Sequence, residues 1–129
     1  MSCDAINTRQ VSVWNATVKQ GADWQHTIRF RDESGAPVDL TGCVFRWAAR
    51  PTFDSNTLTA SMSTTDGRFT IEDAVGGVVS FRLPAAITAA ITAGRFVHDA
   101  EMQWPSGIVE PLWEGAWTLT REAVRGVIP

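Results

Sequence analysis

The side chains that could carry chemistry are few and lie far apart along the chain. The two histidines, His26 and His98, fall on the apolar side of two alternating segments and could meet across a core to hold a metal. A metal site normally needs three or four ligands, and no cysteine or carboxylate shares either face. We therefore expect two packed histidines with one hydrogen bond each, and no metal or other cofactor.

The acidic pairs and the short motifs do not predict catalysis either. Asp32-Glu33 and Glu72-Asp73 are neighbours in turns, where solvated acids are usual, and the patterned calcium-binding loop is missing. The sequence contains no glycine-rich phosphate loop, no Gly-x-Ser-x-Gly elbow and no His-Glu-x-x-His. We expect a protein that is not an enzyme, with no catalytic residues.

The two cysteines, Cys3 and Cys43, are too few for a disulfide scaffold or a zinc site. Cys43 falls on the apolar face of an alternating segment, where a free thiol behaves as a small hydrophobic side chain. We predict two reduced thiols, with Cys43 in the core and Cys3 on a terminal arm.

Composition narrows the class of protein further. The chain has 129 residues, a net charge of −3 and a single lysine, Lys19, so it has no general attraction for nucleic acid or anionic membranes. No apolar run approaches the roughly 20 residues that span a bilayer, and the first residues do not resemble a signal peptide. We expect a protein that folds in a cytoplasm, without nucleic-acid or membrane partners.

The elements that must position these residues are strands. Residues 24–31 alternate apolar and polar side chains, and so do residues 43–50; the turn-forming sequence between them includes Gly35 and Pro37. Similar short runs occupy residues 11–18, 58–62, 69–72, 79–83, 96–104 and 108–120. One helix is predicted over 84–93, beginning at a proline and ending before a glycine.

This pattern predicts an all-β fold, an antiparallel β-sandwich of about seven or eight strands with one short helix (84–93). The sandwich should span residues 11–120, between an N-terminal arm (1–10) and a C-terminal arm (121–129). The predicted core consists of Trp24, Ile28, Phe30, Phe45, Trp47, Phe81, Leu83, Phe96, Met102, Trp117 and Leu119.

Aromatic usage is unusual, with six tryptophans and no tyrosine. Trp24, Trp47, Trp104 and Trp117 fall on inward positions, whereas Trp14 and Trp113 fit the inward pattern less well. Exposed tryptophans are enriched at interfaces, so an interface role for these two is as consistent with the sequence as a core role.

Several turn and strand motifs resemble those of a phage protein family. They include Gln20-Gly-Ala-Asp-Trp24, the Gly-x-Pro-x-Asp-Leu-Thr-Gly signature at 35–42, Ile71-Glu-Asp-Ala-Val-Gly-Gly-Val-Val-Ser-Phe81, Ala93-Gly-Arg-Phe-Val-His-Asp-Ala-Glu101 and Leu112-Trp-Glu-Gly-Ala-Trp-Thr-Leu119. Together they resemble the immunoglobulin-like domain at the start of baseplate upper proteins and tail-fibre proteins of tailed phages. Phe96 and His98 depart from the family, which favours tyrosine at both positions. No fibre extension follows residue 125, so we expect a small assembled component and not a fibre anchor.

The resemblance implies an immunoglobulin-like sandwich and a structural role in a virion. We expect a tail, tail-tip or baseplate component, assembled in the bacterial host cytoplasm, that docks neighbouring subunits through sandwich edges and terminal arms. Its partners would be other virion proteins and copies of itself in a homo-oligomer. The candidate interface residues are Ile6, Trp14, Trp113, Val127 and Ile128. The alternative is a carbohydrate- or receptor-binding module that uses Trp14 or Trp113 as a stacking platform.

Overall fold

Alternating apolar and polar residues form the strands, and turns rich in glycine, aspartate and proline separate them. The computed structural model describes residues 12–123. Its elements are β1 (Ser12–Val13), β2 (Ala16–Lys19), β3 (Trp24–Arg29), β4 (Val44–Arg50), β5 (Ala60–Ser63), β6 (Phe69–Asp73), β7 (Val78–Leu83), α1 (Ala85–Ala90), β8 (Gly94–Gln103) and β9 (Val109–Thr120).

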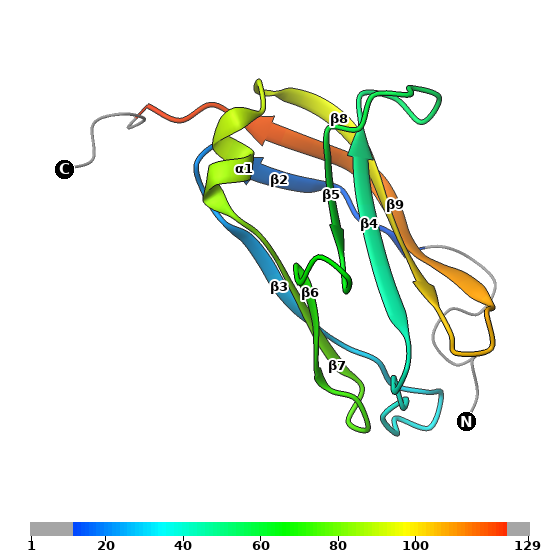
Figure 1. The fold of residues 1–129 in the computed structure, drawn as a ribbon. Coiled ribbons are helices and arrows are strands. Elements are labelled where there is room, and N and C mark those ends of the chain that lie inside the picture. Colours follow the sequence, from blue (N-terminus) through cyan, green and yellow to red (C-terminus); the bar gives the residue numbers. More distant parts are fainter. Residues whose placement is uncertain (1–11, 124–129) are drawn as a thin grey trace.

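The strands form two sheets that face each other across a core (Figure 1). The larger sheet has the order β1-β9-β8-β4-β5, with β2 also paired to β9, and the smaller sheet has the order β3-β7-β6. In an immunoglobulin domain, strands B, E and D share one sheet and strands C, F and G share the other, which C′ can extend. β3, β7 and β6 occupy the B, E and D positions, and β4, β8, β9 and β5 occupy C, F, G and C′. The predicted immunoglobulin-like β-sandwich is therefore confirmed.

One pairing departs from the antiparallel pattern. β1 and β2 run parallel to β9, with Ala16 opposite Trp117 and Val18 opposite Leu119, whereas all other strand pairs are antiparallel. The first predicted strand, 11–18, is also divided into β1 and β2 at Trp14. Local alternation fixes the face that a side chain takes but not the strand that lies beside it, so neither feature was predicted.

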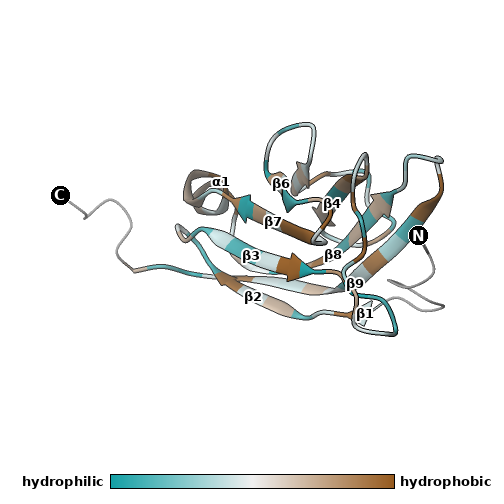
Figure 2. Ribbon diagram, turned by 90° about the horizontal axis from the view of Figure 1, so that it is seen from below, coloured by the Kyte–Doolittle hydropathy of each residue, from teal (hydrophilic) through white to brown (hydrophobic). Residues whose placement is uncertain are grey.

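Inward-facing residues of both sheets build the core. All predicted core residues are buried except Ile28 and Phe96, which are partly buried against the same cluster. The rings of Trp24, Trp47 and Trp117 lie together, with centroid distances of 5.2 Å, 5.4 Å and 5.9 Å, and so join the two sheets. Hydrophobic and hydrophilic bands both occur along β3 and β9 (Figure 2), as in strands with one face toward the core and one toward solvent.

Some loop residues also belong to the core. The sequence did not predict their burial, because loops lack the apolar and polar alternation of strands. Leu40 is fully buried, and its N–H donates to the Ala74 carbonyl at 2.8 Å, which ties the β3–β4 loop to the β6–β7 turn. The prediction that Leu58 shares the buried side of an edge strand with Ala60 and Met62 is wrong for Leu58. Its side chain is 50% exposed, because β5 begins only at Ala60.

The prediction that Cys43 lies in the core is confirmed, because its side chain is buried. Cys3 lies outside the described residues. The thiol of Cys43 therefore contributes to the core as a small apolar group.

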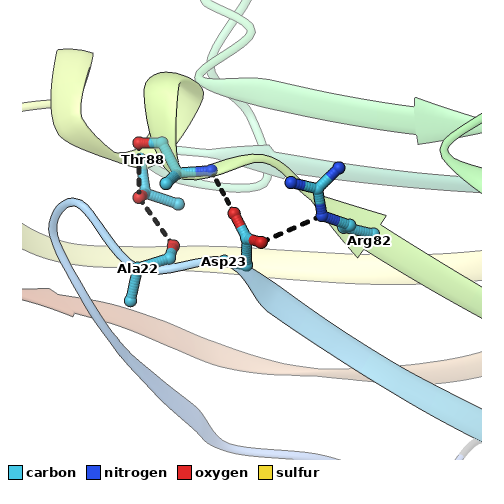
Figure 3. A network of polar contacts seen from close by, with 5 residues as sticks. Ala22, Asp23, Arg82 and Thr88 are labelled. Carbon is cyan, nitrogen blue, oxygen red and sulfur yellow. Dashed lines mark hydrogen bonds and ion pairs between the residues drawn. The ribbon is translucent and has the colours of Figure 1, made fainter.

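The helix α1 is anchored to the turn between β2 and β3 (Figure 3). The Thr88 hydroxyl donates to the Ala22 carbonyl at 2.9 Å and accepts the Gly21 N–H at 3.0 Å. Asp23 accepts the Ala85 N–H at 2.6 Å and the Arg82 Nε–H at 2.9 Å. The hydrogen bond from Arg82 is the main reason that the pKa of Asp23 is lowered. A helix this short is not stable alone, so these contacts hold it.

The helix is shorter than the predicted 84–93. Ile91 has an extended conformation with φ −94° and ψ 133°, so the helix ends at Ala90. The Ile91 carbonyl accepts a hydrogen bond from Gln20 Nε2 at 2.7 Å, which places the chain for its entry into β8. A side chain 71 residues away thus sets this boundary.

Truncation of Trp47 should strongly destabilise the fold. Trp47→Ala should lower the free energy of unfolding by about 3–5 kcal/mol, because it leaves a cavity between the sheets. Leu58→Ala, at a half-exposed position, should change it by no more than about 0.5 kcal/mol. Chemical denaturation of both variants checks this, and a loss below about 1 kcal/mol for Trp47→Ala would contradict the central position of this residue.

Candidate docking surfaces

The structure places two of the five predicted interface residues. Ile6, Val127 and Ile128 lie outside the described residues. Trp113 is only 6% exposed, and its ring lies 4.9 Å from that of Trp14. The indole of Trp113 is therefore part of the core and does not form an exposed stacking platform.

A bulge in β9 explains why sequence alternation misplaced Trp113. Trp113 is paired with Ala100, but the next pair joins Pro111 to Glu101, so Leu112 is an extra residue. A bulge adds one residue to one strand and re-aims its side chains. Both Leu112 and Trp113 are buried as a result.

Trp14 closes one side of the core. It is partly buried, and its ring lies 5.4 Å from Trp24, 5.0 Å from His26 and 6.1 Å from Phe81. Trp24, His26 and Phe81 belong to the smaller sheet, whereas Trp14 sits between β1 and β2 of the larger sheet. Trp14 thus bridges the two sheets while part of its side chain stays accessible.

His98 joins this aromatic cluster to the strands around it. The Trp47 Nε1–H donates to His98 Nδ1 at 2.9 Å, so the proton of the neutral ring is on Nε2, which donates to the Trp14 carbonyl at 2.7 Å. The ring is 1% exposed. Burial lowers the pKa of His98, and the bond to the Trp14 carbonyl partly opposes this shift. The neutral, bridging form is therefore the native one.

The second histidine does not form a metal site with the first. The prediction of two packed histidines is wrong for His26, which is exposed on β3. It is right for the burial of His98, whose two ring nitrogens bond the Trp47 side chain and the Trp14 carbonyl. Within residues 12–123, no group of three or more histidine, cysteine, aspartate or glutamate side chains is placed to hold a metal.

The Trp14–Asn15 segment can approach β9 only because residue 115 is glycine. A Cβ at Gly115 would lie 2.3 Å from the Trp14 carbonyl oxygen. Hydrogen bonds flank this close contact: Trp14 N–H donates to the Glu114 carbonyl, and Ala116 N–H donates to Asn15 Oδ1, each at 2.9 Å. The glycine therefore permits the contact that orients His98.

Charged side chains close the edge strand of the larger sheet. Arg68 Nη1 donates to the Ser61 carbonyl of β5 at 2.9 Å, and Ser63 N–H donates to Asp66 Oδ1 at 3.1 Å. Charged groups on an edge strand oppose pairing with another chain. The edge of β5 is therefore a poor site for strand addition.

The outer face of the larger sheet carries charges of both signs. Burial raises the pKa of Asp99, and the nearby carboxylates of Glu101 and Glu114 raise it further, while Arg50 opposes the shift. Glu101 is itself paired with Arg46 at 3.0 Å. Because carboxylates and guanidinium groups alternate here, this face has no strong preference for cationic or anionic neighbours.

Three loops meet at one end of the sandwich, formed by residues 30–43, 74–77 and 104–108 (Figure 1). A Cβ at Gly77 would lie 2.6 Å from the Phe30 carbonyl oxygen, and a Cβ at Gly42 would lie 2.9 Å from Pro105 Cγ. The three loops are therefore in close contact and form one surface, which we call the loop end.

Exposed apolar side chains project from this loop end. Val75 is 70% exposed, Ile108 is 54% exposed and Val109 is 46% exposed. Ile108 and Val109 are adjacent at the start of β9, whereas Val75 lies in the β6–β7 turn, and exposed apolar side chains at loop ends gain stability when another protein covers them. The loop end is the first candidate docking surface.

The outer face of the smaller sheet carries an open groove of about 860 Å³. Polar side chains dominate its lining, and they include Gln25, Thr27, Arg68, Thr70, Ser80 and Arg82. Such a surface can exchange many hydrogen bonds with a polar ligand but offers little apolar contact.

Comparison with known proteins does not assign this chain to a family. No family model matches this sequence, and no curated protein matches it. Among solved structures, the chain is similar to Drosophila OTK, extracellular domains 3–5, at 15% sequence identity and a TM-score of 0.41. The match covers 92% of this chain but only 37% of that one. The immunoglobulin-like assignment rests on the strand order described above.

Among residues 12–123, no helix has both the length and the hydrophobicity needed to cross a lipid bilayer.

Protonation of His98 should weaken the fold. The unfolded chain binds this proton near the usual pKa of about 6.5, whereas the folded protein binds it only at lower pH. Between the folded-state and unfolded-state pKa values, the unfolded chain holds more protons than the folded protein. The free energy of unfolding should therefore decrease as the pH is lowered, by at most about 1.4 kcal/mol per pH unit. Above about pH 6.5 this contribution is fully present. Denaturant titrations across this range measure it.

The variant His98→Gln is the matched control for this pH dependence. In His98→Gln, Oε1 can accept the Trp47 N–H and Nε2 can donate to the Trp14 carbonyl, but the side chain does not titrate. The difference in pH dependence between this variant and the wild type isolates His98. In His26→Gln the part due to His98 should remain, and equal slopes in His98→Gln and wild type would contradict the assignment.

Gly115→Ala should displace the Trp14–Asn15 segment, because the new methyl group meets a backbone carbonyl that cannot move alone. We expect a loss of about 1–3 kcal/mol in the free energy of unfolding. Gly94→Ala on β8 is the control, since the only heavy atom near a Cβ there is Phe96 Cε2 at 4.0 Å. Equal stability of the two variants would show that the approach at Gly115 is not restrictive.

Proposed function

We propose that this chain is a structural protein of a tailed-phage virion, located in the tail, tail tip or baseplate. It docks neighbouring subunits through its sandwich edges, its loop end and its terminal arms. Its partners are other virion proteins and copies of itself in a homo-oligomer. The motifs that resemble the baseplate and tail-fibre family support this assignment, as does the immunoglobulin-like strand order.

The observation that carries the proposal is the position of the exposed apolar side chains. Val75 and Ile108 lie at the loop end, Val13 of β1 lies beside an edge and is 74% exposed, and Phe53 and Leu58 lie in the connection between β4 and β5. Apolar groups at the ends and edges of a rigid sandwich are suited to contacts with other proteins. A virion subunit uses many such contacts at once.

The terminal arms supply the second part of the proposal. Ile6, Val127 and Ile128 are apolar residues in the segments predicted as arms. Apolar side chains in terminal segments gain stability when a partner subunit buries them. Docking through arms in addition to the sandwich would link copies to their neighbours.

The polar groove favours one alternative, a carbohydrate- or receptor-binding module. The groove offers the hydroxyl and amide groups that bind sugar hydroxyls, whereas Trp113 is buried and cannot provide a stacking platform. Saturable binding on a glycan array that is lost in Thr70→Val would favour this alternative over a docking role.

Deletion of the arms tests the proposed function. A variant without residues 1–10 and 124–129 should keep its melting temperature within about 3 °C, because the sandwich between them is retained. It should fail to enter virions when it replaces the full chain during phage growth, as measured by immunoblots of purified particles. Glu122 is kept because a Cβ at Gly21 would lie 2.2 Å from its carboxylate, so it packs on the β2–β3 turn.

Point variants separate the arms from general damage. Val127→Asp with Ile128→Asp should reduce incorporation as the deletion does, whereas Arg125→Ala should not. Normal incorporation of the deletion variant would contradict a docking role for the arms. Failure of that variant to fold would show that the arms belong to the domain.

A further inference from the structure

We propose that the free edge of β3 is a docking site at which a neighbouring virion subunit adds an extended strand. The identity of the partner rests on the proposed function, whereas the site follows from backbone geometry. In strand addition, main-chain hydrogen bonds supply affinity, and alternate side chains of the added strand supply specificity.

The backbone of β3 alternates between groups that bond β7 and groups that point away from it. In an antiparallel pair, every second residue exchanges hydrogen bonds with the partner strand. Phe30 N–H donates to the Gly77 carbonyl at 2.8 Å, and the same register runs through β3. Even-numbered residues of β3 therefore bond β7. The odd-numbered residues, Gln25, Thr27 and Arg29, direct their N–H and C=O groups toward the free edge.

This edge has no strand beside it in the described part of the chain. Within residues 12–123, β3 pairs with β7 alone. Immunoglobulin sandwiches can carry their first strand beside strand B, which β3 represents, but here β1 and β2 pair with β9 instead. Among the residues that the structure describes, no strand therefore occupies the position beside β3.

The inner face of β3 is correspondingly uncovered. His26 and Ile28 lie on the same face as the buried Trp24, yet His26 is exposed and Ile28 is only partly buried. Trp14 is also partly buried, with its ring 5.0 Å from that of His26. A strand added at this edge would place its inward side chains over these three residues and complete the core.

The edge strands β5 and β3 differ in whether side chains bond their outward backbone groups. At β5, the side chains of Arg68 and Asp66 bond backbone groups of the edge strand. No comparable bond to the backbone of Gln25, Thr27 or Arg29 is present within residues 12–123. The edge of β5 is therefore blocked against pairing, whereas the edge of β3 is available for it.

The side chains of β3 define the chemistry of the partner strand. Its inward positions should be apolar, to cover Ile28 and Trp14. Its outward positions should be polar, and the one opposite Arg29 should be acidic, because Arg29 is exposed and Arg31 follows it closely. The partner is thus an extended segment that alternates apolar residues with threonine, serine or carboxylates.

Amide hydrogen exchange on the purified full chain tests the site. The probe is the peptide acetyl-Thr-Val-Glu-Val-Glu-Val-Thr-amide. In the free protein, the amides of Gln25, Thr27 and Arg29 should exchange much faster than those of His26 and Ile28, which bond β7. At saturating peptide, exchange at the three odd-numbered positions should slow by at least about tenfold.

Variants and modified peptides provide the controls. Thr27→Pro removes a donor from the free edge without removing a β7 bond, and proline is tolerated on edge strands. It should abolish the protection, whereas Thr27→Ala should retain it. A peptide N-methylated at alternate residues tests the same bonds without altering the protein and should not protect. A peptide with lysine in place of glutamate should protect less, because it meets Arg29.

Other occupants of the edge would overturn the proposal. If the three amides exchange slowly in the free protein and dilution accelerates them, a second copy occupies the edge. If dilution has no effect, the terminal residues of the same chain occupy it. Protection by the peptide at β5 or β6, or equal protection of Thr27→Pro, would also overturn it.

The exchange readout is independent of particle incorporation, so the two proposals fail separately. Normal incorporation of the arm deletion, together with peptide protection of β3, would remove the arms from the proposed function and leave the edge proposal intact. Loss of incorporation without any protection of β3 by the peptide would remove the edge proposal alone.

Discussion

The hydrogen bond between Trp47 and His98 is the contact on which the interior of the larger sheet depends. Through His98, it connects β4 and β8 to the Trp14 carbonyl, so it ties three parts of that sheet together inside an aromatic core. Trp47 also packs on Trp24 of the other sheet, at 5.2 Å between ring centroids. Antibody domains join their two sheets by a disulfide between strands B and F. Here Cys43 is the one cysteine of the described part, and packing of tryptophan rings joins the sheets instead.

This arrangement constrains the backbone around it. His98 can reach the Trp14 carbonyl only if the first strand comes close to β9, and Gly115 permits that approach. The bulge that leaves Leu112 as an extra residue turns Trp113 inward, where it packs on Trp14. Both ring nitrogens of the buried His98 are bonded, and these two bonds tie the path of the Trp14 segment to β4 and β8.

The edges of the sandwich differ in whether their backbone groups are covered. Arg68 blocks the edge of β5, whereas no strand within residues 12–123 pairs with the outward backbone groups of Gln25 and Thr27, the edge proposed for a partner strand. The loop end adds exposed apolar tips, such as Val75, on a backbone held by close contacts between loops. A rigid body with a few directional docking sites suits the proposed role in a symmetric particle, because assembly then costs little conformational entropy.

The sequence by itself determined the strands and most of the core. Side chains alternate along any strand, so the pattern around Trp24 and Trp47 assigned their inward faces without knowledge of the neighbouring strands. Only the tertiary structure decided the parallel pairing of β2 with β9, the burial of Trp113 and the edge that stays free. Each of these depends on groups far apart in the chain, as when Arg68 closes β5 or Trp14 covers Trp113. Local periodicity carries no information on such distant pairings, because a strand has the same alternation whichever strand lies beside it.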